Sequence, residues 1–226
     1  TVRRLVTALR EPGVGLVCGR TQVRGADRQI EVEGAYYRFE QWLKERESSR
    51  GWLAGALGAV YAIRAELYSE LHPALINDLT HPCQIALHGY KSRFDPMAIS
   101  EEAAGDDAVR EFSRQTRMTA QGAYVLAVHM PRLLAKGRLG LFWVMLSHKV
   151  ARWVAGLWLI AGAILLPFVS IPLSLAAVAA LVVLWIGWQR RAGWATFPAY
   201  LLLVHLAYLN GLWRALTGDR FVVWKP

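Results

Sequence analysis

The longest uncharged stretch of this chain, from Trp153 to Gln189, constrains its fold most. It holds roughly 37 residues without a charged side chain, and one membrane crossing takes about 20 residues, so the run is long enough to cross a hydrocarbon core twice. Pro167, Ser170 and Pro172 interrupt the run near its middle. The pattern therefore predicts two spanning helices joined by a tight, uncharged turn.

A third apolar segment runs from Ala195 to Trp213 and is interrupted only by His205 and Asn210. At roughly 19 residues it is long enough to span once. Aromatic residues stand near the segment ends, as in an interfacial belt: Trp153, Trp185, Trp188, Trp194, Tyr200 and Trp213. The expected spans lie near residues 153–170, 173–189 and 195–213.

Basic residues set the expected orientation, because Lys and Arg near the ends of spans are retained on the cytoplasmic side. Five of them precede the first span: Arg132, Lys136, Arg138, Lys149 and Arg152. Residues 1–152 are therefore expected in the cytoplasm, with the spans in the inner (plasma) membrane. Arg214 would then lie outside, against the rule, so the third segment is alternatively re-entrant or interfacial.

The net charge of +9 would suit a nucleic-acid partner. Much of the excess is juxtamembrane, where anionic headgroups attract it, and no nucleic-acid-binding motif is present, so the lipid bilayer is the expected partner and nucleic acid is not. Cys18 and Cys83 fit neither a disulfide framework nor a metal site and are expected to be buried. The six histidines show no metal-ligand spacing, so no metal is assigned to this chain.

The residues before the spans alternate between strand and helix patterns, which predicts an α/β fold. Helices are expected at residues 2–9, 33–47, 79–87 and 106–121, and strands at 14–18, 55–61 and 90–99. Residues 123–150, in which Pro131 and Gly137 break apolar stretches, are expected to form amphipathic helices in the membrane interface.

Asp78 is the first candidate for chemistry. Its carboxylate, or the side chain of Asn77, would cap the helix that follows by accepting backbone N–H bonds. A cap at an open helix end also leaves the carboxylate free to act as a general base that takes a proton from an attacking hydroxyl.

A row of polar side chains is the second candidate. Arg110, Arg114, Arg117 and Gln121 recur at helical spacing and so share one face. Such a row can clamp a pyrophosphate through charge-assisted hydrogen bonds, or it can simply be a solvated basic face.

The third candidate is the glycine-rich segment that contains Gly55, Gly58 and Tyr61. Glycine beside an aromatic ring can border a groove for a sugar, whereas the alternative is a tightly packed strand.

In order along the chain, these segments resemble the membrane-anchored family 2 glycosyltransferases, relatives of the cellulose, hyaluronan and poly-N-acetylglucosamine synthases. The resemblance rests on residues 14–19, 37–40 with 47–48, 55–64 with 67–68, 77–78, 89–90 with 95–98, 111–117 and 147–153. It implies that residues 1–122 are the C-terminal, acceptor-side half of a cytoplasmic glycosyltransferase domain and that residues 151–226 are its membrane region.

The family's catalytic base falls on Asp78, with Asn77 in place of the first acid of the family's acidic pair. Its Gln-x-x-Arg-Trp element falls on Arg114 to Met118, where Arg117 matches the Arg and Met118 replaces the Trp. Because that Trp would pack on an acceptor sugar, its absence favours single transfer to a short or lipid-linked acceptor over processive synthesis.

The family's Asp-x-Asp, which binds the donor's diphosphate through Mg²⁺ or Mn²⁺, has no counterpart in these residues. The metal and much of the donor site are therefore expected from an N-terminal half, without which the chain should be inactive.

The resemblance thus implies an inverting hexosyltransferase of polysaccharide or glycolipid synthesis, with a nucleotide-sugar donor and a glycan or lipid-linked acceptor. Asp78 would be its base, Arg114 and Arg117 would hold the diphosphate, and Gly55, Gly58 and Tyr61 would border the acceptor. One alternative is a non-catalytic scaffold subunit of a polysaccharide export complex. A small transporter is the other, which the near absence of ionisable groups inside the spans disfavours.

Overall fold

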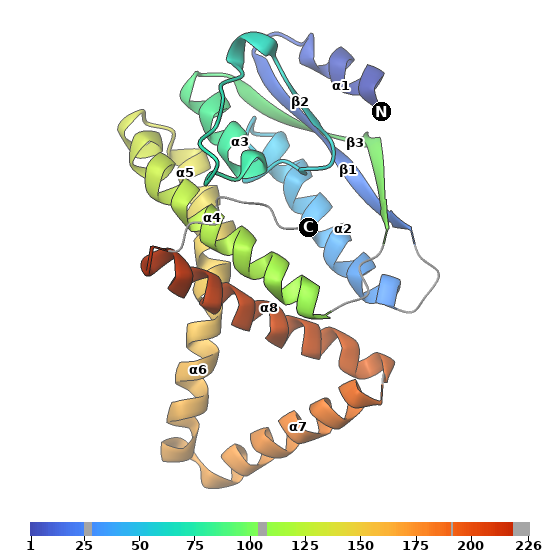
Figure 1. Cartoon of the computed structure of the whole chain (residues 1–226), viewed down its shortest axis with the longest axis vertical. Coiled ribbons are helices and arrows are strands. Elements are labelled where there is room, and N and C mark those ends of the chain that lie inside the picture. The colour runs from blue at the N-terminus through green and yellow to red at the C-terminus, as the bar shows by residue number, and fades with distance from the viewer. Residues whose placement is uncertain (25–28, 104–107, 191, 219–226) are drawn as a thin grey trace.

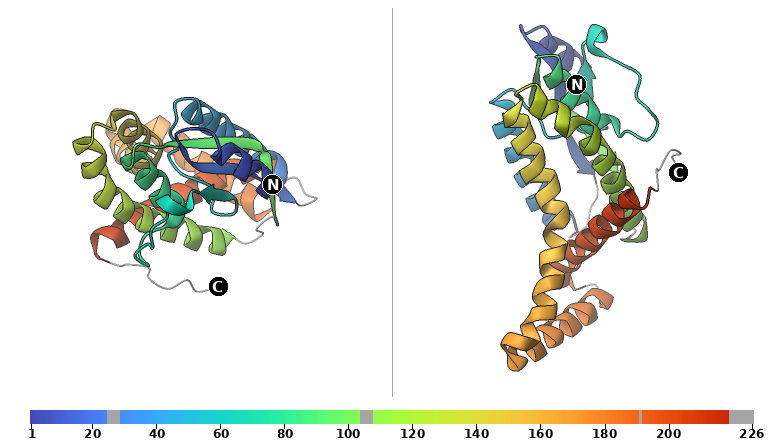
Figure 2. Two further views of the ribbon diagram at one scale, coloured as in Figure 1. Left: turned by 90° about the horizontal axis from the view of Figure 1, so that it is seen from above. Right: turned by 90° about the vertical axis from the view of Figure 1, so that its left-hand side faces the viewer.

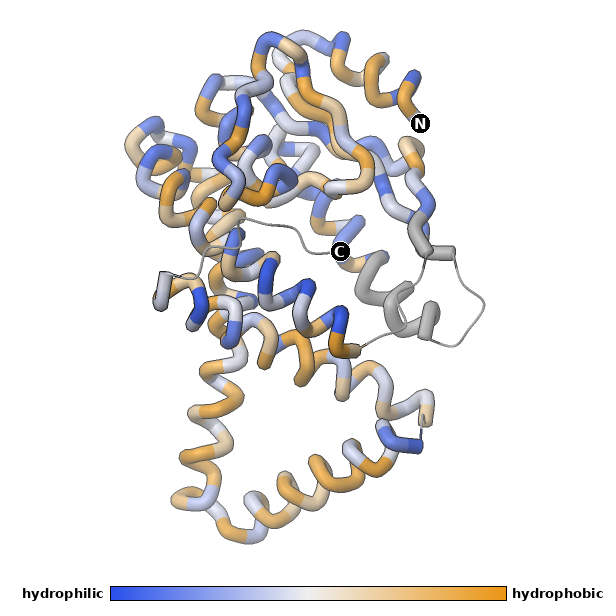
Figure 3. Tube along the Cα trace, viewed as in Figure 1, coloured by the Kyte–Doolittle hydropathy of each residue, from blue (hydrophilic) through white to orange (hydrophobic). Residues whose placement is uncertain are grey.

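A computed structural model describes residues 1–24, 29–103, 108–190 and 192–218. The chain has a part built on a small sheet and an elongated part made of long helices (Figure 1). Charged and polar residues concentrate in the first part, and apolar residues cover the far helices of the second (Figure 3).

The sheet has three strands in the order β2-β1-β3. The central strand β1 (Val14–Arg24) pairs antiparallel with β2 (Tyr61–Ile63) and parallel with β3 (Lys91–Ala103). Leu16, Val17 and Cys18 of β1 have no exposed surface, as expected for the middle strand of a covered sheet. A mixed sheet with helices confirms the predicted α/β class.

Helix α3 (Asn77–Leu87) starts earlier than its pattern predicted, and the prediction that Asn77 or Asp78 caps it is wrong. Ile76 occupies the N-cap position without a side-chain hydrogen bond, and the Asn77 side chain accepts from the Asp78 N–H at 2.8 Å. Asp78 therefore stands inside the first turn. The helix stops before Gly89, whose φ of 89° only glycine adopts readily.

The expected strand over residues 55–61 is wrong as well, since only Tyr61 onward joins the sheet. Of the backbone before it, the Ala56 N–H donates to the Asp78 carbonyl and the Val60 N–H donates to the Leu57 carbonyl, while the Val60 carbonyl accepts from the Gly19 N–H of β1. Residues 51–60 are a loop, which we call the glycine loop, held on the first turn of α3.

The other helices of this part are α1 (Val2–Leu9), α2 (Gln29–Ser48) and α4 (Ala108–Ala135), with a short 3₁₀ turn at Ala65–Leu67. Helix α4 continues well beyond Gln121, where the pattern predicted its end, and contains Pro131. Its later turns bury Val125, Leu126 and Leu133, so packing carries the helix forward.

Helix α5 (Leu139–Met145) follows, and a π-helical turn at Leu146–Val150 leads into α6 (Ala151–Val169). Helices α7 (Ile171–Gln189) and α8 (Gly193–Leu216) complete the described chain. Ser170 separates α6 from α7 and accepts from the Leu173 N–H.

Among the described residues, three helical stretches are long and apolar enough to cross a membrane: Leu139–Val169, Ile171–Gln189 and Gly193–Leu216. Helices α6 and α7 extend away from the sheet, whereas α8 returns and lies along α4 (Figures 1 and 2). At one end of that contact Tyr200 donates to Glu111, and at the other the Asn210 amide donates to Thr116.

Candidate functional site

The carboxyl group of Asp78 lies between α3 and the glycine loop. Its Oδ2 atom is 3.8 Å from the position that a β-carbon would take at Gly58, and nothing else lies within 4 Å of that position. The loop is fixed there by the Ala56 hydrogen bond to the Asp78 carbonyl, 2.7 Å long. The structure thus brings Asp78 close to Gly55 and Gly58, which precede it by 23 and 20 residues in the sequence.

Burial raises the pKa of Asp78 above its usual value, and the nearby positive charges of Lys149 and Lys44 oppose that shift. A carboxylate with a raised pKa is a stronger base than a solvated one, and nearby cations favour its ionised form. The surroundings of Asp78 therefore suit proton abstraction.

Tyr61 and His81 form a hydrogen-bonded pair one helical turn beyond Asp78. The Tyr61 hydroxyl lies 3.0 Å from His81 Nδ1, and the Tyr68 ring packs 5.7 Å from the imidazole. Burial lowers the pKa of His81, and burial with the Asp78 charge raises the pKa of Tyr61 to about 12, so both are neutral at pH 7. His81 Nε2 is buried without a hydrogen-bond partner among the described residues.

Two lysines from distant elements border the glycine loop. Lys44 of α2 donates to the Gly55 carbonyl at 2.5 Å, and Lys149 Nζ lies 3.7 Å from the position of a β-carbon at Gly55. Glu40 pairs with Arg152 at 2.7 Å; burial raises the pKa of Glu40, but Arg152, Lys149 and Lys44 together hold it below its usual value.

Sequence reasoning missed His81, Lys44 and Lys149 as site residues. The available signal was at Lys149, which together with Arg152 is a charge within a stretch otherwise apolar enough to span. Such a charge is a functional candidate by default.

Arg114 and Arg117 lie on α4 and are engaged with neighbours on that helix. Arg114 forms a two-pronged ion pair with Glu111, at 2.7 and 2.8 Å, and Arg117 donates to Gln121 at 3.2 Å. Neither arginine is among the charges that shift the pKa of Asp78. Their role at a diphosphate stays a prediction.

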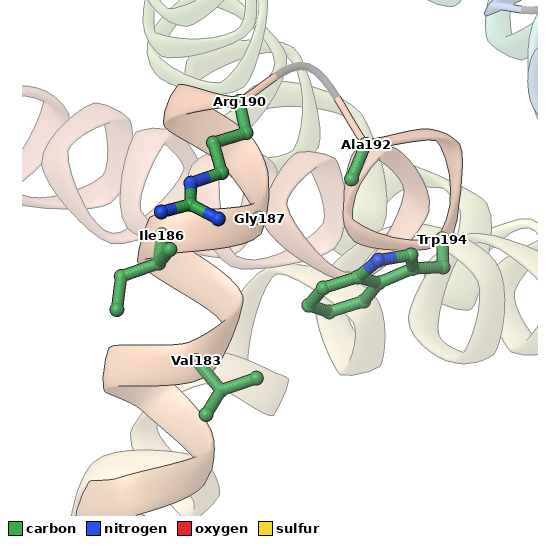
Figure 4. Close-up of a pocket in the computed structure, with 6 residues that line it drawn as sticks. All are labelled: Val183, Ile186, Gly187, Arg190, Ala192 and Trp194. Atoms are coloured by element: carbon green, nitrogen blue, oxygen red, sulfur yellow. The ribbon is translucent and has the colours of Figure 1, made fainter.

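Two surface cavities lie away from Asp78. One, of about 350 Å³, is formed by Val183, Ile186, Gly187, Arg190, Ala192 and Trp194 at the junction of α7 and α8 (Figure 4). The other, of about 480 Å³, is a polar hollow between the end of α2 and β3. Neither includes the Asp78 side chain.

Within the described ranges, no three His, Cys, Asp or Glu side chains are grouped so that they could hold a metal ion. Cys18 and Cys83 are buried free thiols, as expected. The described residues therefore do not fit the Mg²⁺ or Mn²⁺ that the resemblance implies, and no chemical step is assigned to a metal in this chain.

No family model matches the chain, and no curated protein matches its sequence. Among solved structures, it is similar to the mannosyltransferase PcManGT from Pyrobaculum calidifontis in complex with GDP-Man and Mn²⁺, with a TM-score of 0.59 and 19% identity. The match covers 92% of this chain but only 57% of that one, so this chain spans little more than half its length. The likeness shows a glycosyltransferase-like fold.

Proposed function

We propose, from the fold shared with a mannosyltransferase, that the chain is the acceptor-side part of an inverting glycosyltransferase at the cytoplasmic face of a membrane. It would transfer a sugar from a nucleotide-sugar donor to a glycan or lipid-linked acceptor in polysaccharide or glycolipid synthesis. The observation that carries the proposal is the Asp78 carboxyl, partly desolvated beside two lysines and facing the bare Cα of Gly58.

In this mechanism Asp78 takes the proton of an acceptor hydroxyl as its oxygen attacks the anomeric carbon of the donor. The bond from that carbon to the diphosphate oxygen breaks, and the nucleoside diphosphate leaves with the electron pair. Attack from the face opposite the leaving group inverts the anomeric centre. Gly55 and Gly58 leave room for the acceptor, and Tyr61 borders it.

Arg114 and Arg117 are proposed to steady the leaving diphosphate, as expected from the resemblance. For Arg114 this requires exchange of its Glu111 partner for a phosphate oxygen, which a guanidinium also binds in a two-pronged manner. A divalent cation in this reaction would be bound by residues outside this chain.

The test is release of nucleoside diphosphate by the full-length protein in membranes, with a panel of sugar nucleotides that begins with GDP-mannose. Asp78→Asn should reduce donor- and acceptor-dependent release at least 100-fold while insertion is unchanged. Glu70→Gln, which neutralises an exposed carboxyl in the loop before α3, is the control. Release unaffected by Asp78→Asn would remove Asp78 as the base, and no release with any donor would favour the non-catalytic scaffold.

A further inference from the structure

The amino groups of Lys44 and Lys149 converge on one residue of the glycine loop, although the lysines are 105 residues apart in the sequence. Lys44 bonds the Gly55 carbonyl, and Lys149 lies over the side of Gly55 that lacks a β-carbon. Both ammonium groups are close enough to Asp78 to act on its pKa. They therefore border the same space as the proposed base.

Three cations gather around this space. Lys44, Lys149 and Arg152 all act on the pKa of Glu40, and the two lysines also act on the pKa of Asp78. Glu40 is engaged by Arg152. Among the described residues the Lys149 ammonium feels the charges of Glu40 and Asp78 but makes no hydrogen bond or ion pair of its own. A largely desolvated ammonium without a direct partner is unfavourable, and an anion would relieve it.

The turn that carries Lys149 is held against the glycine loop through the neighbouring residue His148. It stands in the π-helical turn, next to His148, whose Nδ1 lies 2.6 Å from the buried Glu47 carboxylate. Glu47 also accepts from the Ala54 N–H at 2.7 Å. One carboxylate thus fastens the π-helical turn to the residue before Gly55, and π-helical turns recur at functional sites.

We propose that Lys44 and Lys149 bind a phosphate group beside Asp78, on the side of Gly55 that carries no side chain. The place of this group in a reaction rests on the proposed glycosyltransferase function, but the binding does not. A lysine ammonium binds phosphate oxygens as a point charge with three donors. The phosphate belongs either to the diphosphate of the donor or to a lipid-linked acceptor, whose phosphate would lie where α6 leaves the soluble part.

The first experiment measures binding of inorganic pyrophosphate to the full-length protein in zwitterionic nanodiscs by titration calorimetry. Lys149→Met and Lys44→Met should each weaken binding about tenfold or more, because each removes one of two converging cations. The control variant Lys136→Met removes an exposed juxtamembrane lysine in the turn after α4 and should change the affinity for pyrophosphate less than twofold. Equal affinity in wild type and Lys149→Met overturns the proposal.

Two further variants separate binding from folding. Lys149→Arg keeps the charge and should retain most of the affinity. Gly55→Ala keeps both lysines, and its β-carbon would meet only ordinary contacts at 3.7–3.9 Å, so the protein should fold normally. The added methyl group takes part of the proposed phosphate space and should weaken pyrophosphate binding, whereas unchanged binding would count against the site.

Two probes distinguish the sources of the phosphate. If Lys149→Met weakens GDP binding and leaves undecaprenyl phosphate binding unchanged, the site holds the donor diphosphate, and the opposite result assigns it to the acceptor lipid. If Lys149→Met weakens the binding of neither probe, the proposed phosphate site is overturned. If pyrophosphate binding depends on Lys149 but no sugar is transferred, the phosphate site is retained and the proposed glycosyltransferase function is rejected. If sugar transfer depends on Asp78 but pyrophosphate binding does not depend on Lys149, the function is retained and the phosphate site is rejected.

Discussion

The glycine loop and the contact between α4 and α8 both depend on glycine, for opposite reasons. At Gly211 of α8 a β-carbon would lie 2.6 Å from the Thr116 carbonyl and 2.7 Å from Thr119 Cβ, both on α4. At Gly55 the nearest atoms are 3.7 Å away, and at Gly58 only the Asp78 carboxylate is near. Glycine lets two helices touch in one region, whereas in the other a β-carbon would meet only ordinary contacts at Gly55 and only the Asp78 carboxylate at Gly58. Packing therefore explains Gly211 but does not explain Gly55 and Gly58.

The largest effect is expected from a variant that breaks the contact between α4 and α8. In Gly211→Ala the new β-carbon would push α8 away from the backbone of α4, and such overpacking should cost about 1–3 kcal/mol of stability. Thermal unfolding in detergent micelles measures it. Gly162→Ala on α6, whose β-carbon would meet nothing within 4 Å, is the control and should leave the Tm unchanged or slightly raised. Equal Tm values for the two variants would contradict the comparison.

Gly58→Ala tests the loop in the same way. Its β-carbon has room, so the fold should keep its stability within about 1 kcal/mol. If the space beside Asp78 receives an acceptor, the new methyl group should lower the rate of sugar transfer by about tenfold, equivalent to about 1.4 kcal/mol. A stable variant with full activity would show that the space is not used.

Thr116→Val tests whether the contact between α4 and α8 serves the stability of the fold alone. It removes the acceptor of the Asn210 amide bond, 3.3 Å long, in a buried part of that contact. The expected loss is about 1 kcal/mol of stability. Transfer activity, measured below the unfolding temperature, should not change, and a selective loss of activity would link the contact to the site.

The smallest effect concerns pH. Because burial raises the folded pKa of Asp78 above its unfolded value, ionisation of Asp78 opposes folding as pH rises through the folded pKa. Asp78→Asn should therefore raise the Tm at pH 7 while it abolishes transfer, and the gain should vanish towards pH 3, where the wild-type carboxyl is protonated in both states. A lower Tm at pH 7 would instead assign Asp78 a structural role.

Local patterns predicted most of the elements but only part of the candidate site. The strand from Val14, the helix from Val2 and the apolar helices all follow from hydrophobic periodicity and run length, which are properties of neighbouring residues. The apolar run of residues 55–61 predicts a strand, but a short run does not reveal where its backbone hydrogen bonds go. Here one of them goes to α3.

The lysines illustrate the other limit. Lys44 and Lys149 become neighbours of Gly55 only through the packing of α2 and the π-helical turn around the loop. No spacing in the sequence links them. Local sequence makes Asp78 a candidate and the resemblance makes it the expected base, whereas the cations that act on its pKa needed tertiary structure.

The π-helical turn before α6 also sets a rotational phase. A π-helical turn amounts to one residue inserted into an α-helix, and each residue advances the helix by about 100°. The looser winding of that turn absorbs the extra residue, so α6 continues with the phase that places Arg152 against Glu40 and the Trp153 ring against Gly122. If the turn were forced into regular α-helical winding with no residue removed, all of α6 would rotate by about 100° and both contacts would be lost. The direction in which α6 faces therefore depends on the winding of one turn, with no change in hydropathy or length.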